Sequence, residues 1–233
     1  MSSCLLCGSE SHQEVFREPH AFFEEEEYVL VRCTGCGLMR AEPPLPVDYH
    51  EAALPEDYSE EDVEDYLFRK RLGEFGKKLS LIHKFKRGGR LLDVGCHLGH
   101  FMRFAQREGW DVWGLDVADG YTAYAREKGL KNVFITSLRE ARLQENFFDV
   151  VTIWNTLEHL SQPLEELKEV NRILKREGII ALSLPCARYV RLKVFFLSRV
   201  PLLRGLLFPD LESLLPHTHL FNFTPKTAEA LLA

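Results

Sequence analysis

The sequence predicts an α/β protein with a mostly parallel sheet and a small amino-terminal unit held by cysteines. Two observations predict this. From residue 90 onward, short apolar runs alternate with helical stretches, which is the pattern of βαβ units. Before residue 41, the pattern Cys-x-x-Cys-Gly occurs twice. A chain of 233 residues, 45% of them hydrophobic, is long enough to bury a core of this kind.

The two cysteine pairs predict a zinc ribbon over residues 1–41. The pairs are Cys4 with Cys7 and Cys33 with Cys36, each followed by a glycine. Two intervening residues let one tight turn present both sulfurs to the same ion, and the glycine relieves the strain of that turn. Four thiolates make a closed structural zinc site, which would stabilise a unit too small to build its own core. The alternatives are a redox pair and unligated core thiols.

Residues 42–89 read as an acidic connector followed by a helix. Residues 42–65 contain ten acidic side chains and no lysine or arginine, which is typical of a solvated connector. From about residue 59 to 85, apolar residues recur at spacings of three and four, and Gly88-Gly89 follows as a helix stop.

Residues 90–233 form the predicted α/β domain. The predicted strands are 91–94, 112–116, 133–135, 148–154 and 179–184, and the predicted helices are 98–108, 118–128 and 163–174. The last stretch, 185–233, is less regular and ends inside an apparent helix.

A glycine-rich turn follows the first predicted strand. Asp93 lies near the end of that strand, Gly95 permits a sharp reversal, and Gly99 lets the start of the next helix pack close to the strand. Asp116 ends the second strand, at the spacing where a carboxylate accepts both hydroxyls of a ribose. The pattern G-x-G-x-x-G of NAD sites is missing, as is the lysine-containing phosphate loop of ATP and GTP sites.

These residues resemble the class I S-adenosylmethionine-dependent methyltransferases over roughly 90–225. The sequence 93–99 is similar to their first motif, 114–116 to their ribose-binding strand end, and 155–160 to the Glu-His-Leu turn after their fourth strand. The resemblance implies a Rossmann-like sheet of order 3-2-1-4-5. The amino-terminal ribbon resembles a bacterial subgroup that modifies sugars, polysaccharides or natural products. The cofactor-binding residues that the resemblance implies are Asp93, Gly95, Cys96, His97, Gly99, Phe101, Asp116, Val117, Ser137, Leu138 and Asn155.

Two positions depart from the family pattern. His97 stands where the family commonly has its middle glycine, so we expect its side chain to crowd or contact the methionine part of the cofactor. The chain also stops where the family usually adds two more strands, so we expect either a carboxyl-terminally short form or a sheet completed differently.

A general base is needed if the methyl acceptor is a hydroxyl or an acidic carbon. His159 is the first candidate, followed by His217 or His219, because imidazoles titrate near working pH. The alternative is that Glu158 and His159 only order the turn after the fourth strand. Cys96 is interpreted as a packing residue.

The remaining features of the sequence limit the possible partners and the cellular location. Residues 188–208 are basic and apolar, which indicates an amphipathic lid, a membrane-surface or subunit contact, or a core helix pair. The net charge of −6 argues against a nucleic-acid partner. The paired cysteines and the lack of a signal segment favour the cytoplasm. The hypothesis is a zinc-bearing methyltransferase acting on a small molecule; the alternative is a degenerate binding module with the same fold, and a nucleic-acid modifier comes last.

Overall fold

The structure is a computed structural model that describes residues 3–19, 27–44, 49, 61–192 and 218–233. The chain divides into two compact units, named here unit 1 and unit 2. Unit 1 comprises Met1–Val47, Asn155–Leu164 and Leu184–Ala233, and unit 2 comprises Asp48–Trp154 and Glu165–Ser183. Unit 1 therefore joins three segments that are far apart in the sequence. The division into 1–41, 42–89 and 90–233 stays a prediction.

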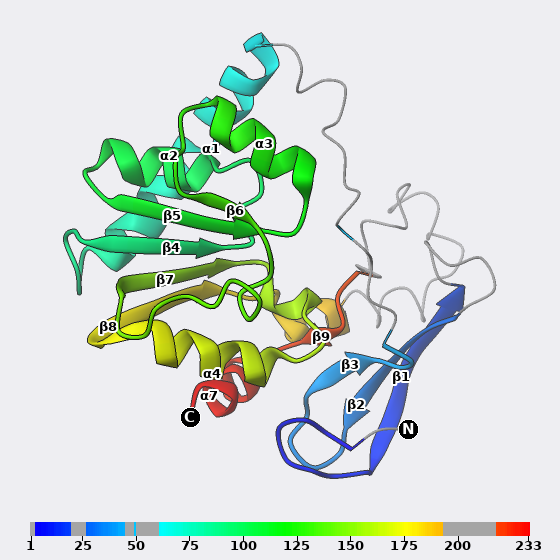
Figure 1. The fold of residues 1–233 in the computed structure, drawn as a ribbon. Helices are drawn as coiled ribbons and strands as arrows, with labels where there is room; N and C mark the ends of the chain where they lie inside the picture. The colour runs from blue at the N-terminus through cyan, green and yellow to red at the C-terminus, as the bar shows by residue number, and fades with distance from the viewer. Residues whose placement is uncertain (1–2, 20–26, 45–48, 50–60, 193–217) are drawn as a thin grey trace. The chain divides into compact units, whose positions relative to one another are not determined.

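Unit 2 is built on a five-stranded parallel sheet with the order β6-β5-β4-β7-β8 (Figure 1). When the five strands are numbered along the chain, their order across the sheet is 3-2-1-4-5, which confirms the predicted fold class. In such a sheet ligands bind beyond the carboxyl ends of the strands where the order reverses, here at β4 and β7. The strands are β4 (Arg90–Val94), β5 (Asp111–Asp116), β6 (Val133–Ile135), β7 (Phe148–Trp154) and β8 (Leu174–Ser183).

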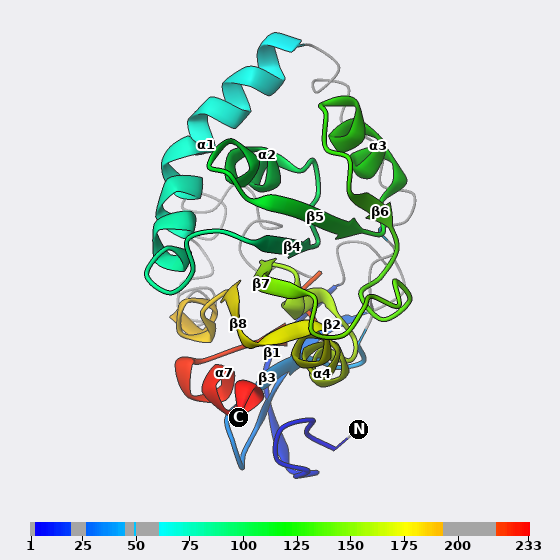
Figure 2. The ribbon, with the colours of Figure 1, turned by 60° about the vertical axis from the view of Figure 1, so that its left-hand side comes forward.

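Four helices accompany this sheet: α1 (Glu61–Ile82), α2 (His100–Arg107), α3 (Asp119–Glu127) and α4 (Pro163–Ile173). Buried side chains from the first three join one apolar cluster with the sheet, among them Phe75 on α1, Met102 on α2 and Ala125 on α3. Figure 2 shows α1, α2 and α3 on one side of the sheet and α4 on the other. Both faces of the sheet are thus covered, as a parallel sheet requires.

The start of β8 differs from the prediction. A strand over 179–184 was expected, but β8 begins at Leu174, directly after α4. Its pairing with β7 moves from Phe148↔Leu174 to Val150↔Ile179, so two steps along β7 match five along β8. The extra residues form a bulge. A Cβ atom at Gly178 would lie 2.9 Å from the carbonyl oxygen of Lys175, so the bulge requires a glycine.

Unit 1 contains an antiparallel sheet of order β1-β2-β3-β9. The strands are β1 (His12–Pro19), β2 (Glu27–Cys33), β3 (Met39–Ala41) and β9 (Phe221–Asn222). The sequence indicated no strand at β9, which pairs Met39 with Asn222 and Arg40 with Phe221. A segment of two residues is too short to show the alternation of polar and apolar residues that predicts a strand. The formation of β9 depends on its pairing with β3. The carboxyl-terminal segment is therefore part of the same sheet as β1, β2 and β3, the sheet of the predicted ribbon.

A second apolar cluster supports unit 1. Tyr28, Leu30 and Met39 of the sheet pack with Ala187 and Val190, which lie in the helical stretch 187–192. The rest of the predicted amphipathic segment 188–208 lies outside the described residues. The predicted terminal helix is confirmed as α7 (Pro225–Leu232), with a capping box between Thr224 and Thr227. Within the described part of the chain, no helix is both long and apolar enough to cross a membrane.

Candidate functional site

The turn between β4 and α2 has a left-handed backbone at several residues. Gly95, His97 and Gly99 all have positive φ values, of 72°, 50° and 68°. The amides of Gly95 and Cys96 both donate to the carbonyl of Leu115 on β5, at 2.8 and 3.0 Å. Gly99 caps α2, and a Cβ there would lie 2.4 Å from the Leu130 side chain. Gly99 was predicted to let the start of the helix pack close to the strand, but the atoms that a Cβ there would meet belong to Leu130 and Ala125 instead.

Asp116 lies at the carboxyl end of β5, beside this turn. Its Oδ2 accepts the backbone N–H of His97 at 2.7 Å, and its Oδ1 accepts the N–H of Ala118 at 3.0 Å. These two bonds fix the orientation of a carboxylate that is only partly buried. A carboxylate has about four acceptor positions, so both oxygens can still accept hydroxyl groups. The geometry therefore fits a ribose-binding carboxylate.

The ring of His97 lies against Tyr121 on α3. The two ring centroids are 3.9 Å apart with an interplanar angle of 45°, and His97 is exposed. The expectation that this side chain meets the methionine part of the cofactor stays a prediction. Sequence reasoning missed Tyr121, because its position on α3 alone does not tell which residue it faces.

Asp93 lies inside unit 2, with 2% of its surface exposed. Thr152 on β7 donates to its carboxyl oxygen at 2.6 Å. Burial raises the pKa of Asp93 to about 7, against the opposing effects of Thr152 and the Lys78 ammonium. This carboxyl group joins β4 to β7 beneath the turn, and direct contact with a cofactor stays a prediction.

Two other residues that were predicted to contact the cofactor lie in the core. Cys96 is 5% exposed, and burial raises the pKa of its thiol well above the usual value. The interpretation of Cys96 as a packing residue agrees with this burial. Phe101 is 4% exposed and packs edge-to-face with Trp154 at 5.4 Å. Their role toward the cofactor stays a prediction.

The predicted adenine-side residues follow β6. Leu138 is 2% exposed, while the hydroxyl of Ser137 donates to Glu140 at 2.7 Å. Val117, after β5, is partly buried. Asn155 directly follows β7, is exposed and has a φ of 53°. Asn155 belongs to unit 1, whereas the other three belong to unit 2.

Lys78 of α1 was not foreseen from the sequence. Its ammonium lies 4.8 Å from the ring centroid of Trp154, the last residue of β7, and 2.6 Å from Glu74. The apolar spacing that predicts this helix does not indicate which of its several lysines points toward the sheet. The structure thus places a cation at the carboxyl end of the central strands.

Unit 1 holds a cluster of one carboxyl and two imidazoles: Glu158, His159 and His219. One ligand atom from each lies within 4.8 Å of the others. Burial raises the pKa of Glu158 to about 7 and, with the neighbouring His159, lowers that of His219 to about 3. Burial also lowers the pKa of His159. The first candidate base is therefore a neutral imidazole in a cluster; His217, the next candidate, lies outside the described residues.

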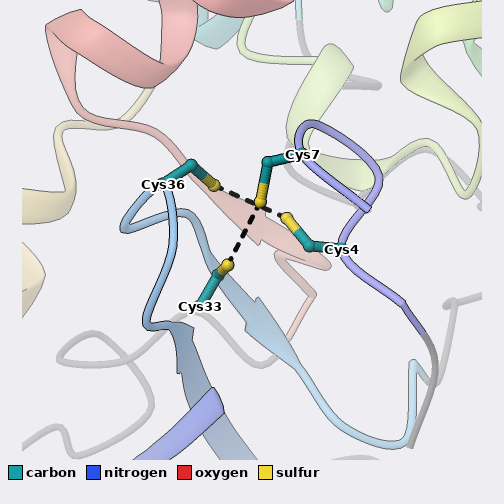
Figure 3. Close-up of side chains that lie close together, drawn as sticks. All are labelled: Cys4, Cys7, Cys33 and Cys36. Atoms are coloured by element: carbon teal, nitrogen blue, oxygen red, sulfur yellow. Dashed lines mark hydrogen bonds between the residues drawn. The ribbon is translucent and has the colours of Figure 1, made fainter. Parts of the chain in front are cut away.

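The four predicted zinc ligands come together in unit 1. Figure 3 shows the sulfurs of Cys4, Cys7, Cys33 and Cys36 pointing toward one centre. Cys4 Sγ lies 3.5 Å from Cys36 Sγ, and Cys7 Sγ lies 3.5 Å from Cys33 Sγ. All four lie within 4.8 Å of one another. Zinc–sulfur bonds of about 2.3 Å at tetrahedral angles separate sulfurs by about 3.8 Å, so the four thiols fit a zinc ion.

The two turns that carry these cysteines have the same backbone. The N–H of Gly8 donates to the carbonyl of Cys4 at 2.8 Å, and Gly37 donates to Cys33 at 3.0 Å. Both glycines have positive φ values, of 69° and 84°. Although burial opposes it, backbone amides of the second turn and the Cys7 thiol lower the pKa of Cys33 to about 6. Burial, with the neighbouring thiols, raises the pKa of Cys36 in the same turn to about 12, so the turn favours a thiolate at Cys33 and a thiol at Cys36.

The family described as "Methyltransferase domain" matches residues 64–233. Because this is well over half of the chain, the chain belongs to this methyltransferase family. The prediction of a methyltransferase enzyme is confirmed at the level of the family. The match runs from α1 to the end of the chain and includes Asp116, the turn at 95–99 and the cluster around Glu158.

Individual relatives are similar over shorter stretches. A ubiquinone biosynthesis O-methyltransferase of Ruegeria pomeroyi is 34% identical over 120 residues, which are 49% of this chain and 48% of that protein. The chain spans about half the length of the curated relatives that it matches. An S-adenosylmethionine-dependent methyltransferase structure from Mesorhizobium loti is 25% identical, with a TM-score of 0.44 over 48% of this chain and 53% of that one. The YcgJ protein of Bacillus subtilis is 20% identical, with a TM-score of 0.48 over 67% and 66%.

Proposed function

We propose that the chain transfers a methyl group from S-adenosylmethionine to a small-molecule acceptor. The observation that carries the proposal is the Asp116 carboxylate, held by two backbone amides at the carboxyl edge of the sheet. The family match supports the class of reaction. When bound, the cofactor supplies a methyl group on a sulfonium: its carbon–sulfur bond breaks, a bond to the acceptor forms, a thioether remains and the acceptor's proton leaves.

In this proposal the chain binds and orients. Asp116 accepts the ribose hydroxyls, and the positive-φ backbone of 95–99 lets a ligand approach closely, because two of its residues lack side chains. Alignment of the reacting atoms and exclusion of water supply several kcal/mol of the rate enhancement, so no protein nucleophile is required. If the acceptor is a hydroxyl or an acidic carbon, His159 is the candidate to take its proton.

The acceptor is proposed to be a sugar, a polysaccharide precursor or a natural product. The relative from Ruegeria pomeroyi is named for ubiquinone biosynthesis, which supports a small molecule but leaves O- and C-methylation equally open. We also propose that the four cysteines bind a structural zinc ion. The location is proposed to be cytoplasmic, because four converging cysteines of the metal-binding type are typical of a reducing compartment.

Calorimetric titration with S-adenosylhomocysteine, the demethylated cofactor, tests the proposal. We expect wild-type protein to bind it and Asp116→Asn to bind about 10- to 100-fold more weakly, because a charged hydrogen-bond acceptor is lost. Asp119→Asn, an exposed aspartate three residues later, is the matched control and keeps wild-type affinity. If the zinc-loaded wild-type chain binds neither form of the cofactor, the proposal is wrong.

His97 at the middle-glycine position favours a second candidate function. A methyltransferase-fold binding module would keep the cofactor or the fold without turnover. Binding of the cofactor without methylation of any sugar, polysaccharide-precursor or phenolic acceptor would leave this candidate ahead of the enzyme.

A further inference from the structure

The carboxyl group of Glu158 is buried, and no hydrogen-bond donor to it is found among the residues that the structure describes. Glu158 belongs to the short helix η2 (Leu157–His159), and none of its surface is exposed. The lack of a donor holds for both of its carboxylate oxygens, within the described part of the chain. Buried polar groups in native proteins are nearly always satisfied, and a buried carboxyl with no partner costs several kcal/mol. The cost indicates that a ligand normally occupies this position.

The distances around Glu158 fit a shared cation rather than a direct bond. His219 Nε2 lies 4.0 Å from Glu158 Oε1, which is too long for a hydrogen bond. Two ligands of one tetrahedral zinc ion, at about 2.0–2.1 Å each, are about 3.4 Å apart. Small side-chain movements would therefore bring both atoms to one ion, and the third residue of the cluster, His159, has a ligand atom within 4.8 Å of both.

The orientation of His159 matches that of a metal ligand. Its Nδ1 lies 2.9 Å from the carbonyl oxygen of Thr218. A carbonyl only accepts, so Nδ1 carries the hydrogen and Nε2 carries the lone pair. A metal-binding histidine characteristically donates its other ring N–H to a backbone carbonyl in this way. The His219 ring packs edge-to-face on His159, with centroids 4.8 Å apart.

We propose that Glu158, His159 and His219 form a second metal site, which binds a divalent first-row cation such as Zn²⁺. Two imidazoles and one carboxylate are a ligand set for Zn²⁺, Fe²⁺ or Mn²⁺, and the set leaves coordination positions for water or another ligand. The cysteine site is closed, whereas this site is open. The inference is independent of the proposed methyl transfer.

The site would also connect two distant segments of unit 1. Glu158 follows β7, whereas His219 precedes β9, and the backbone already joins them where the Leu220 N–H donates to the Glu158 carbonyl at 2.9 Å. An ion would hold η2 to the segment that completes the ribbon's sheet. With the ion bound, the lone pair of His159 is a ligand and not a general base, so the test below separates the two roles.

The test measures the metal content and the cobalt spectra of the whole 233-residue chain. We expect the wild-type chain to bind two Zn²⁺ and the variants Glu158→Gln and His219→Gln to bind one. In the Co²⁺-loaded variants the thiolate-to-cobalt absorption of the cysteine site remains, which shows that unit 1 is still folded. Glu229→Gln, an exposed glutamate on α7, is the matched control and retains two ions.

Thermal unfolding at two zinc levels gives a second measurement. With one equivalent of Zn²⁺, which the four thiolates take first, Glu158→Gln is expected to melt higher than wild type because it removes a buried charge. With excess Zn²⁺ only the wild type gains stability, and the order reverses. A wild-type chain that binds one Zn²⁺, or a second ion that both variants retain, overturns the proposal.

Discussion

Different kinds of interaction stabilise the interiors of the two units. In unit 2 a large apolar cluster receives buried side chains from α1, α2, α3 and the sheet. Among the described residues of unit 1 the apolar cluster has fewer members, and two polar clusters lie in the same unit: four thiols, and a carboxyl with two imidazoles. Apolar burial alone stabilises a domain of the size of unit 2, whereas a small multi-segment unit needs cross-links. The comparison predicts that the units respond differently to the same perturbation.

Each unit contains a buried carboxyl group, and the surroundings of these two groups show the same difference. Asp93 in unit 2 accepts a hydrogen bond from Thr152, whereas Glu158 in unit 1 has no donor among the described residues. Burial raises the pKa of both to about 7. In unit 2 a neighbouring side chain donates a hydrogen bond to the buried Asp93 carboxyl. In unit 1 the Glu158 carboxyl has no such donor among the described residues, which is the environment expected of a ligand to an ion.

The largest expected effect is the loss of unit 1 when the cysteine site is broken. A structural zinc site of this kind contributes about 10 kcal/mol or more to folding. We expect Cys33→Ser to lose its zinc and to lose amide-exchange protection in β1, β2 and β3, while β4–β8 remain protected. Mass spectrometry of metal content and of hydrogen exchange measures both.

Cys186→Ser is the matched control, because Cys186 is an exposed free cysteine outside the site. It should keep zinc and protection in every strand. Equal loss of protection in both units of the Cys33 variant would break the comparison, because the units would then unfold as one.

The next effect is a pH dependence carried by Asp93. Its pKa is about 7 in the folded state and near 3.8 ordinarily, so the folded state keeps a proton that the unfolded state releases. The free energy of unfolding therefore falls as pH rises from about 4 to 7, by about 1.4 kcal/mol per unit and about 4 kcal/mol at most. Asp93→Asn removes this contribution and leaves the slope of the same sign that Glu158 adds. Denaturant titrations of both proteins at several pH values measure the difference.

Asp149 is the control with the opposite sign. Partial burial opposes the shift, but Lys175 and the backbone amide of Arg90 lower its pKa below the ordinary value. Its contribution is present above the ordinary pKa and is lost as pH falls below it, so Asp149→Asn should flatten the acid side of the profile. An Asp93→Asn profile parallel to wild type between pH 4 and 7 would contradict the assignment.

A smaller effect comes from close packing at the turn. Gly99 and Gly129 both have positive φ values, but a Cβ at Gly99 meets Leu130 at 2.4 Å, whereas one at Gly129 meets nothing within 4 Å. Alanine at Gly129 adds only backbone strain, about 1 kcal/mol. Gly99→Ala adds a steric clash, and we expect about 2–3 kcal/mol in total. Equal destabilisation of the two variants in urea would show that α2 does not need this close approach.

The sequence predicted unit 2 well because its signals are local. Strand and helix periodicities lie within single segments, and the structure places the elements within a few residues of the predicted ranges. The exception is the start of β8, where the bulge before Ile179 depends on pairing with β7. Strand register is a property of two segments, and one of them does not determine it.

The same reason divides the candidate sites. The cysteines lie in a local pattern that occurs twice, so the sequence predicted that their four sulfurs converge. The pairing of Glu158 with His219 depends on how β9 joins the ribbon's sheet. Tyr121 and Lys78 were missed because the direction of a long side chain depends on packing.

The smallest expected effect concerns the His97 ring, and it tests whether the turn of unit 2 is built for its ligand or for its own packing. Replacing His97 with glycine relieves about 1 kcal/mol of left-handed strain but loses the contact with Tyr121, worth about 0.5–1 kcal/mol. Stability should therefore change little. If the ring serves only that contact, His97→Gly and Tyr121→Leu shift the affinity for S-adenosylhomocysteine equally, and the double variant adds nothing. If the ring also contacts the methionine part of the ligand, His97→Gly alone changes the affinity severalfold, and a calorimetric double-mutant cycle distinguishes the two.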